Sequence, residues 1–280
     1  NIILKSTASN TAGMIKVNSS SGYSYSSGTF TVERFFSATN PGWRMVSAPI
    51  QNSTLNDWND EFDYCGFAGA DYSYAGCGYF CSVWFYDETA ASVGNSGTGF
   101  DSATNITNST SPDNGSIIYT AQGSTTLSVS GNPEFRDRSF SVTKSGADAA
   151  FGYNLVSNPY PANLNFNSLR TESGTSDFTD NYWIFSGDAG TYKDKTDLGG
   201  SIIIAQNQGF FVHLSDAKDI DFKVNQTTKS SSSFEKSNNG VNLPLSLRLT
   251  SDQNTYYDNA HLMAGSEYTI DYDSTQESPK

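Results

Sequence analysis

Residues 42–50 read GWRMVSAPI, and residues 152–160 repeat the pattern as GYNLVSNPY. The two copies share Gly, Val, Ser and Pro in register, and an aromatic residue follows each Gly. Alternating side chains predict a strand in each copy, and the Pro at its end stops ladder pairing and turns the chain. The chain is therefore expected to contain two copies of one β unit.

Other matches follow in the same order along both copies. Residues 83–86 (VWFY) match 182–185 (YWIF), Ile117-Ile118 match Ile203-Ile204, and residues 140–142 (FSV) match 222–224 (FKV). The spacing between matched elements shortens along the chain, which indicates insertions at 64–80 and 94–115 of the first copy. Long insertions on a rigid scaffold are where proteins tend to place binding residues. The matched Trp84 and Trp183 are expected to anchor the core.

Composition favours an all-β protein. The 280 residues are 14% aromatic and only 16% charged, and aromatic side chains fit a pleated, half-buried surface. We expect tandem antiparallel β-sandwich-like repeats, with a closed barrel or small propeller as the alternative and almost no helix beyond a turn near 54–61. The expected parts are N-terminal strands continuing from an upstream region (1–40), repeat 1 (41–145), repeat 2 (146–228), a linker (229–240) and the start of a third β module (241–280).

The net charge of the chain disfavours some classes of binding partner. The net charge is −13 and the pI about 4.4, so the chain repels nucleic-acid phosphates and anionic membrane surfaces. No apolar stretch reaches the roughly 18 residues that a membrane span needs, so direct membrane insertion is not expected. The same acidity attracts divalent cations or basic surfaces, which leaves calcium open as a ligand.

Three cysteines, Cys65, Cys77 and Cys81, lie within one Gly- and Tyr-rich segment. Their clustering predicts one local disulfide, from Cys65 to Cys77 or Cys81, and one remaining thiol. Exported proteins use such bonds to hold loops that have little apolar content. Zinc is the competing interpretation, but the three cysteines form no CxxC pair.

Candidate binding residues gather in the same region of the first repeat. Trp58, Tyr72, Tyr74 and Tyr79 would form an aromatic platform for a sugar. The densest acidic cluster would hold calcium or line a surface turn, because hard cations require several oxygen ligands; its members are Asp57, Asp60, Glu61 and Asp63.

Motifs for enzymatic chemistry are absent. The sequence has no GxSxG, P-loop, GxGxxG or HExxH motif, and its two histidines, His213 and His261, lie far apart in sequence. We expect no enzymatic activity, although a discontinuous pair of glycosidase carboxylates is invisible to sequence patterns.

The combination of residues 1–8 (NIILKSTA), 31–35 (TVERF), the two repeated motifs and 208–212 (QGFFV) resembles large exported proteins of Bacteroidetes, the cargo of type IX secretion. In that family such a region precedes a C-terminal sorting domain, and Leu247-Arg248-Leu249 with residues 257–260 (YDNA) resembles its closing segment. The resemblance implies export, a surface location, and O-glycosylation at the Asp-Ser/Thr sites of Ser102 and Ser274.

Three functions are compatible with these observations. The first is a non-enzymatic extracellular structural or adhesive surface protein, which self-assembles into a filament or array or contacts neighbouring surface modules through a sheet edge such as residues 2–5. The second is a carbohydrate-binding module that recognises glycans. The third is the accessory region of a secreted hydrolase. We favour the first.

Overall fold

The computed structural model describes residues 1–7, 11–14, 28–38, 41–92, 98–110, 112, 115–120, 123–187, 189–228, 245–250 and 257–262. The chain divides into two compact units, Asn1–Ser237 and Asn238–Lys280. Strands make up 46% of the structure, which is an all-β, sandwich-like fold as expected. The described sheets are open, so the alternative of a closed barrel was wrong.

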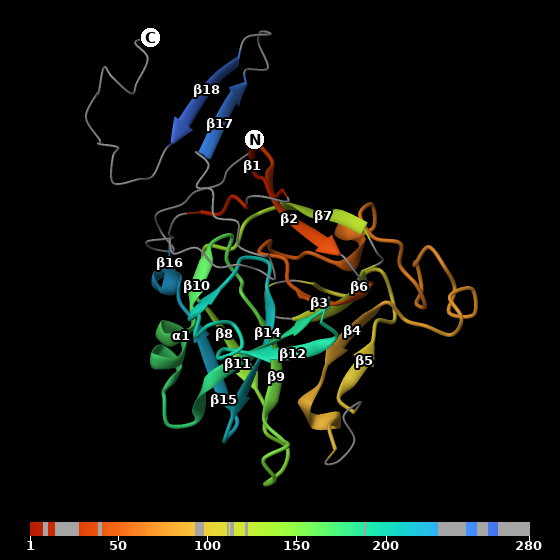
Figure 1. Ribbon diagram of the computed structural model, residues 1–280, viewed down its shortest axis with the longest axis vertical. Coiled ribbons are helices and arrows are strands. Elements are labelled where there is room, and N and C mark those ends of the chain that lie inside the picture. The colour runs from red at the N-terminus through yellow and green to blue at the C-terminus, as the bar shows by residue number, and fades with distance from the viewer. Residues whose placement is uncertain are drawn as a thin grey trace. The chain divides into compact units, whose positions relative to one another are not determined.

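Two four-stranded antiparallel sheets form the centre of the first unit (Figure 1). The first has the order β3-β6-β4-β5, and its strands are Gly42–Val46, Ser116–Thr120, Val83–Tyr86 and Phe100–Ser102. The second has the order β9-β14-β11-β12, with strands Tyr153–Ser157, Gly209–Leu214, Phe178–Ser186 and Thr191–Asp194. Each sheet belongs to one repeat, and the strand orders correspond one to one.

The sheets also correspond residue by residue. Each carries the same row of three side chains across β3-β6-β4 or β9-β14-β11. The rows are Met45, Ile117 and Trp84 in the first sheet, and Leu155, Phe211 and Trp183 in the second. The match between Trp84 and Trp183 is therefore correct, but the match of Ile117 with Ile203 is wrong, because register places Phe211 where Ile117 lies.

These rows meet between the sheets in an aromatic cluster. Phe211 contacts Tyr86 and Phe100 of the other sheet edge-on, with ring centroids 4.9 and 6.2 Å apart. Edge-to-face pairs of this kind stabilise a packed interface beyond the area that they bury. Trp84 and Trp183 pack against the cluster but are only half-buried, so they lie at the margin of the core and not within it.

The repeated motif holds the two repeats together. Ser47 donates its backbone N–H to Asn207 O (3.0 Å) and its hydroxyl to Asn158 O (3.2 Å), both in the second repeat. A Cβ on Gly42 would lie 2.5 Å from the carbonyl oxygen of Gly187, so only glycine allows this approach. The motif is thus a structural joint between repeats.

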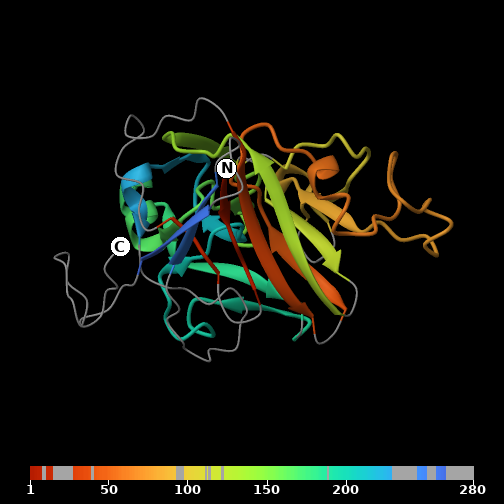
Figure 2. The same ribbon diagram turned by 90° about the horizontal axis from the view of Figure 1, so that it is seen from above.

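A third sheet covers the larger core of this unit. It has the order β1-β2-β7, with strands Ile2–Leu4, Phe30–Ala38 and Gly123–Gly131, and β2 and β7 run side by side in Figure 2. Val32, Leu127 and Val129 point into the core, where they join side chains from both repeats. The pair β8 (Arg138–Val142) and β15 (Lys218–Phe222) joins the last strand of repeat 1 to a late strand of repeat 2.

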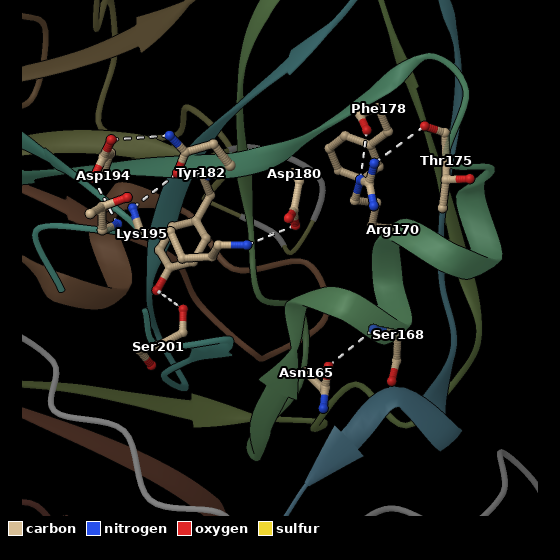
Figure 3. Close-up of polar contacts among 12 residues, drawn as sticks. Asn165, Ser168, Arg170, Thr175, Phe178, Asp180, Tyr182, Asp194, Lys195 and Ser201 are labelled. Carbon is tan, nitrogen blue, oxygen red and sulfur yellow. Dashed lines mark hydrogen bonds and ion pairs between the residues drawn. The ribbon is translucent and has the colours of Figure 1, made fainter. Parts of the chain in front are cut away.

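The helix α1 (Phe166–Ser173) was not expected from the sequence. Asn165 caps it by accepting from Ser168 N (3.0 Å), and Arg170 Nε donates to Phe178 O (2.7 Å) to fix its end (Figure 3). Phe166 and Leu169 bury its inner face. It lies beside the small sheet β13-β10-β16, whose strands are Ile203–Ile204, Asn163–Asn165 and Thr227–Thr228.

The described residues of the first unit also form three short 3-10 helices: η1 (Leu55–Trp58), η2 (Glu88–Ala90) and η3 (Val224–Gln226). The turn expected near 54–61 is η1. In the second unit, β17 (Leu245–Thr250) pairs antiparallel with β18 (Tyr257–Leu262), so the two segments that resemble the sorting-domain closing motif form one hairpin.

Candidate functional site

The cysteine-bearing insertion forms a loop that is closed by a disulfide. Cys65 bonds Cys77, with Cα atoms 6.0 Å apart, while Cys81 is free and buried. This confirms the expected local disulfide and selects Cys77 over Cys81 as the partner of Cys65. The thiol of Cys81 points inward and donates to Val83 O (3.2 Å), and burial raises its pKa. We call residues 64–80 the stapled loop.

Backbone hydrogen bonds order the stapled loop internally. Tyr72 N donates to Tyr64 O and Gly66 N donates to Tyr72 O, both at 3.0 Å, which ties the outgoing and returning segments together. Asp71 accepts the N–H of Tyr64 through its carboxylate (2.7 Å). At the tip, Tyr79 N donates to Tyr74 O at 2.8 Å. The loop is therefore a defined structure.

The base of the loop is anchored in the first repeat. Phe80 forms a triangle of rings with Trp43 and Tyr119, at centroid distances of 5.0 to 5.5 Å. A Cβ on Gly69 would lie 2.6 Å from the side chain of Ile106, so the loop packs closely against the neighbouring segment. The orange loop extends from the rest of the first unit on one side in Figures 1 and 2.

Three tyrosines of the stapled loop are exposed. Tyr72, Tyr74 and Tyr79 have exposed fractions of 51%, 52% and 73%, and the rings of Tyr74 and Tyr79 lie 5.7 Å apart at 78°. Tyr79 has a φ of +66°, a backbone region that non-glycine residues seldom adopt. The backbone strain of the loop tip thus lies at Tyr79, which is also the most exposed of the three tyrosines.

Trp58 does not belong to this exposed group. It is fully buried in η1, beside the equally buried Leu55. An exposed platform therefore contains only the three tyrosines, and the inclusion of Trp58 was wrong. The hydrogen-bonded tip also sets Tyr74 and Tyr79 nearly perpendicular, so the pair does not form the flat face on which a sugar ring would stack.

The four acidic residues proposed for calcium lie near the base of the loop but have different environments. Asp57 is used as a cap, since it accepts from Thr54 N at 2.7 Å, while Asp60 and Asp63 are exposed. Burial, with the neighbouring carboxyl of Asp60, raises the pKa of Glu61 to about 8. Among the described residues, no three His, Cys, Asp or Glu side chains gather in a way that could hold a metal ion.

Two buried carboxylates elsewhere were missed by sequence reasoning. Glu88 accepts hydrogen bonds from the backbone N–H groups of Ser145 and Gly152, both at 2.9 Å. Glu134 is fully buried and pairs with Arg136 (2.8 Å) and Arg138 (3.1 Å). Both carboxylates are occupied by internal donors, which suits a structural role. Only Glu134 had a sequence signal, namely the two arginines that follow it closely.

The remaining predicted residues are placed as follows. Ser102 is exposed at the end of β5, whereas Ser274 and residues 94–97, 111, 113 and 114 of the second insertion lie outside the described residues. His213 contacts Phe151 O through Nε2 at 3.1 Å, and its ring lies 4.5 Å from that of Tyr153. The polar groups around β11, such as the Lys195–Asp180 pair at 2.7 Å and Tyr182 donating to Ser201 O, bind one another (Figure 3).

Comparison with known proteins found no matching family model, no matching curated protein and no matching solved structure. The disulfide is compatible with an extracellular protein. Within the described part of the chain, no helix combines the length and the apolar character that a membrane crossing demands.

Proposed function

We propose that this chain is a non-enzymatic extracellular module of a structural or adhesive surface protein, and that it contacts its target through the stapled loop. The observation that carries the proposal is the exposure of three tyrosines on a loop that a disulfide and a backbone ladder hold in place. Tyrosine provides a large contact area with little conformational entropy to lose, which makes it effective in recognition.

The resemblance to type IX secretion cargo supports an exported surface protein, and the disulfide suits that location. The rest of the molecule serves as a scaffold in this proposal. Its two buried carboxylates, Glu88 and Glu134, are bound by internal donors, and this speaks for a binding function over an acid–base one.

The test is adhesion of the purified chain to a panel of immobilised extracellular proteins and insoluble polysaccharides. The loop variant combines Tyr72→Leu, Tyr74→Leu and Tyr79→Leu, and Tyr192→Leu is the matched control because Tyr192 is also an exposed tyrosine, on β12. We expect the native chain and the control to bind at least one surface and the loop variant to lose that binding. Equal binding by all three proteins, or no binding to any surface, would refute the proposal.

Self-assembly is a second route to the same function, favoured by one observation. Strand β1 lies at the edge of its sheet, and its Ile2 and Ile3 are 42% and 49% exposed. An exposed apolar edge can add a strand from another copy. Light scattering and electron microscopy should then show large particles that Ile3→Lys reduces to monomers, and a monomeric native chain would contradict this route.

A further inference from the structure

The first repeat has an unusual distribution of charge. Residues 45–135 contain ten acidic residues and not one Lys, Arg or His, whereas all 16 basic residues of the chain lie outside this range. Ordinary protein surfaces mix both signs of charge. The stapled loop therefore belongs to a long segment that offers carboxylates and aromatic rings but no cation of its own.

Several of these carboxylates surround the base of the stapled loop. Asp71 accepts the backbone N–H of Tyr64 through its carboxylate at 2.7 Å, and Asp63 directly precedes Tyr64, whose carbonyl oxygen accepts the N–H of Tyr72 at 3.0 Å. Tyr64 is fully buried, and its hydroxyl has no hydrogen-bond partner among the described residues; the same holds for Oε2 of Glu61. The backbone ladder thus brings the segment that carries Asp63 alongside the segment that carries Asp71 and Tyr72.

The exposed tyrosines complete this chemistry. The face of a phenol ring attracts a guanidinium or ammonium group, and the attraction is strongest where anions lie nearby. Tyr74 and Tyr79 stand nearly perpendicular, so a long basic side chain can place its cationic group over the face of one ring and pack its aliphatic stem against the other. A neutral glycan offers no charge to match the carboxylates, and a nucleic acid or an anionic glycan offers the wrong one.

We propose that the stapled loop recognises a cationic protein surface, in which Arg or Lys side chains contact the tyrosine rings and pair with the exposed carboxylates Asp60 and Asp63. The inference rests on the proposed function, since it names the partner chemistry of the same loop. Arginine is the better match because its planar guanidinium stacks on aromatic rings and pairs with carboxylates in parallel.

The experiment titrates the full chain with four N-acetylated peptides: ten arginines, ten lysines, ten glutamates and a neutral Gly-Ser peptide of equal length. We expect the arginine peptide to bind best, the lysine peptide more weakly and the other two not at all. Binding should weaken about tenfold or more between 0.05 and 0.5 M salt, as expected of exposed charges.

Variants separate site binding from general attraction to an acidic protein. The triple Tyr→Leu variant keeps the net charge and is expected to lose about tenfold or more in affinity, whereas triple Tyr→Phe keeps the rings and the binding. Asp63→Asn should weaken binding more than Glu172→Gln, which removes one exposed charge from α1. The inference would be overturned if Asp63→Asn and Glu172→Gln weakened peptide binding equally. It would also be overturned if the triple Tyr→Leu and triple Tyr→Phe variants lost equal affinity.

The outcome also distinguishes this inference from the function on which it rests. If the triple Tyr→Leu variant loses adhesion and the native chain binds a polysaccharide with an affinity that does not depend on salt, the cationic partner is wrong. The proposed role of the stapled loop in binding is then still supported. Adhesion that is independent of the tyrosines would overturn both.

Discussion

Replacing Glu88 tests whether the buried carboxylate joins the two repeats. Glu88 lies on η2 of the first repeat and is buried. It accepts from Ser145 N through both oxygens (2.9 Å each), from the Ser145 hydroxyl (3.1 Å) and from Gly152 N (2.9 Å). Gly152 opens the second repeated motif, so the side chain holds the connection that leads into the second repeat.

The loss of unfolding free energy expected on replacing Glu88 depends on the Ser145 and Gly152 donors, which lose their carboxylate acceptor. Hydrogen bonds to a charged group contribute about 1.5–3 kcal/mol each, and their effects do not add in full. Glu88→Gln keeps one acceptor oxygen but turns an amide N–H₂ toward donors, so we expect a loss of about 2–3 kcal/mol of unfolding free energy. Glu88→Ala leaves the buried N–H of Gly152 without an acceptor, and a loss of about 3–5 kcal/mol is expected.

The effect also depends on pH in a defined direction. Burial by itself raises the pKa of Glu88, but the donors from Ser145, Gly152 and Thr143 outweigh burial and lower the pKa below its ordinary value of 4.5. A lowered carboxyl pKa stabilises the fold fully above the unfolded-state pKa, and this stabilisation is lost as pH falls through the folded-state pKa. The difference in unfolding free energy between the native chain and Glu88→Gln should therefore have its full size at pH 7 and become smaller below about pH 4.5.

Urea unfolding followed by tryptophan fluorescence measures these values, because all four tryptophans lie in the first unit. Glu172→Gln is the control, since Glu172 is exposed on α1, and its effect should stay within about 0.5 kcal/mol. The reasoning fails if Glu88→Gln also stays within that range, or if its penalty is the same at pH 7 and pH 4.

Three further substitutions test other parts of the fold. Gly42→Ala forces a Cβ against the carbonyl of Gly187, and thermal unfolding should show a loss of about 1–3 kcal/mol, with an unchanged midpoint as the contradicting result. Cys65→Ser with Cys77→Ser removes a 12-residue closure that constrains the unfolded chain, so tryptophan-detected unfolding should show a loss of about 3 kcal/mol. Limited proteolysis should also cut the loop faster, and an unchanged unfolding free energy would contradict this role of the disulfide. Glu134→Gln breaks the ion pairs of a buried carboxylate and should cost about 2 kcal/mol in urea unfolding; a neutral result would contradict a stabilising role of these pairs.

The strands of the repeats could be predicted because their signals are local. An alternating pattern ended by Pro identifies β3 and β9, and the repeated Trp identifies β4 and β11. The match of Ile117 with Ile203 failed because two neighbouring apolar pairs looked alike, and only cross-strand register shows that Phe211 takes the equivalent place. Sequence similarity over two residues does not determine register.

The helix α1 was missed although its signal was present. Asn165 is a favourable N-cap, and Phe166 and Leu169 share one face at helical spacing. The eight-residue length was too short to outweigh an all-β expectation.

At the candidate site, the disulfide and the exposed tyrosines were predictable, but the burial of Trp58 was not recognised. Residues three apart in a 3-10 helix lie on the same side, so η1 turns Leu55 and Trp58 together into the core while Asp57 faces solvent. The role of Glu88 could not be found from sequence, because its donors lie 57 and 64 residues further along the chain.

The pairing of β8 with β15 bears on the timing of folding. Arg138 lies opposite Phe222 and Val142 opposite Lys218, so the closing strand of the first repeat waits for a partner about 80 residues later. At a synthesis rate of about 5–20 residues per second, that partner leaves the ribosome roughly 4–16 s after β8. During this interval the exposed edge of β8 is open to wrong partners, so the chain should depend on holding factors until its second repeat is complete.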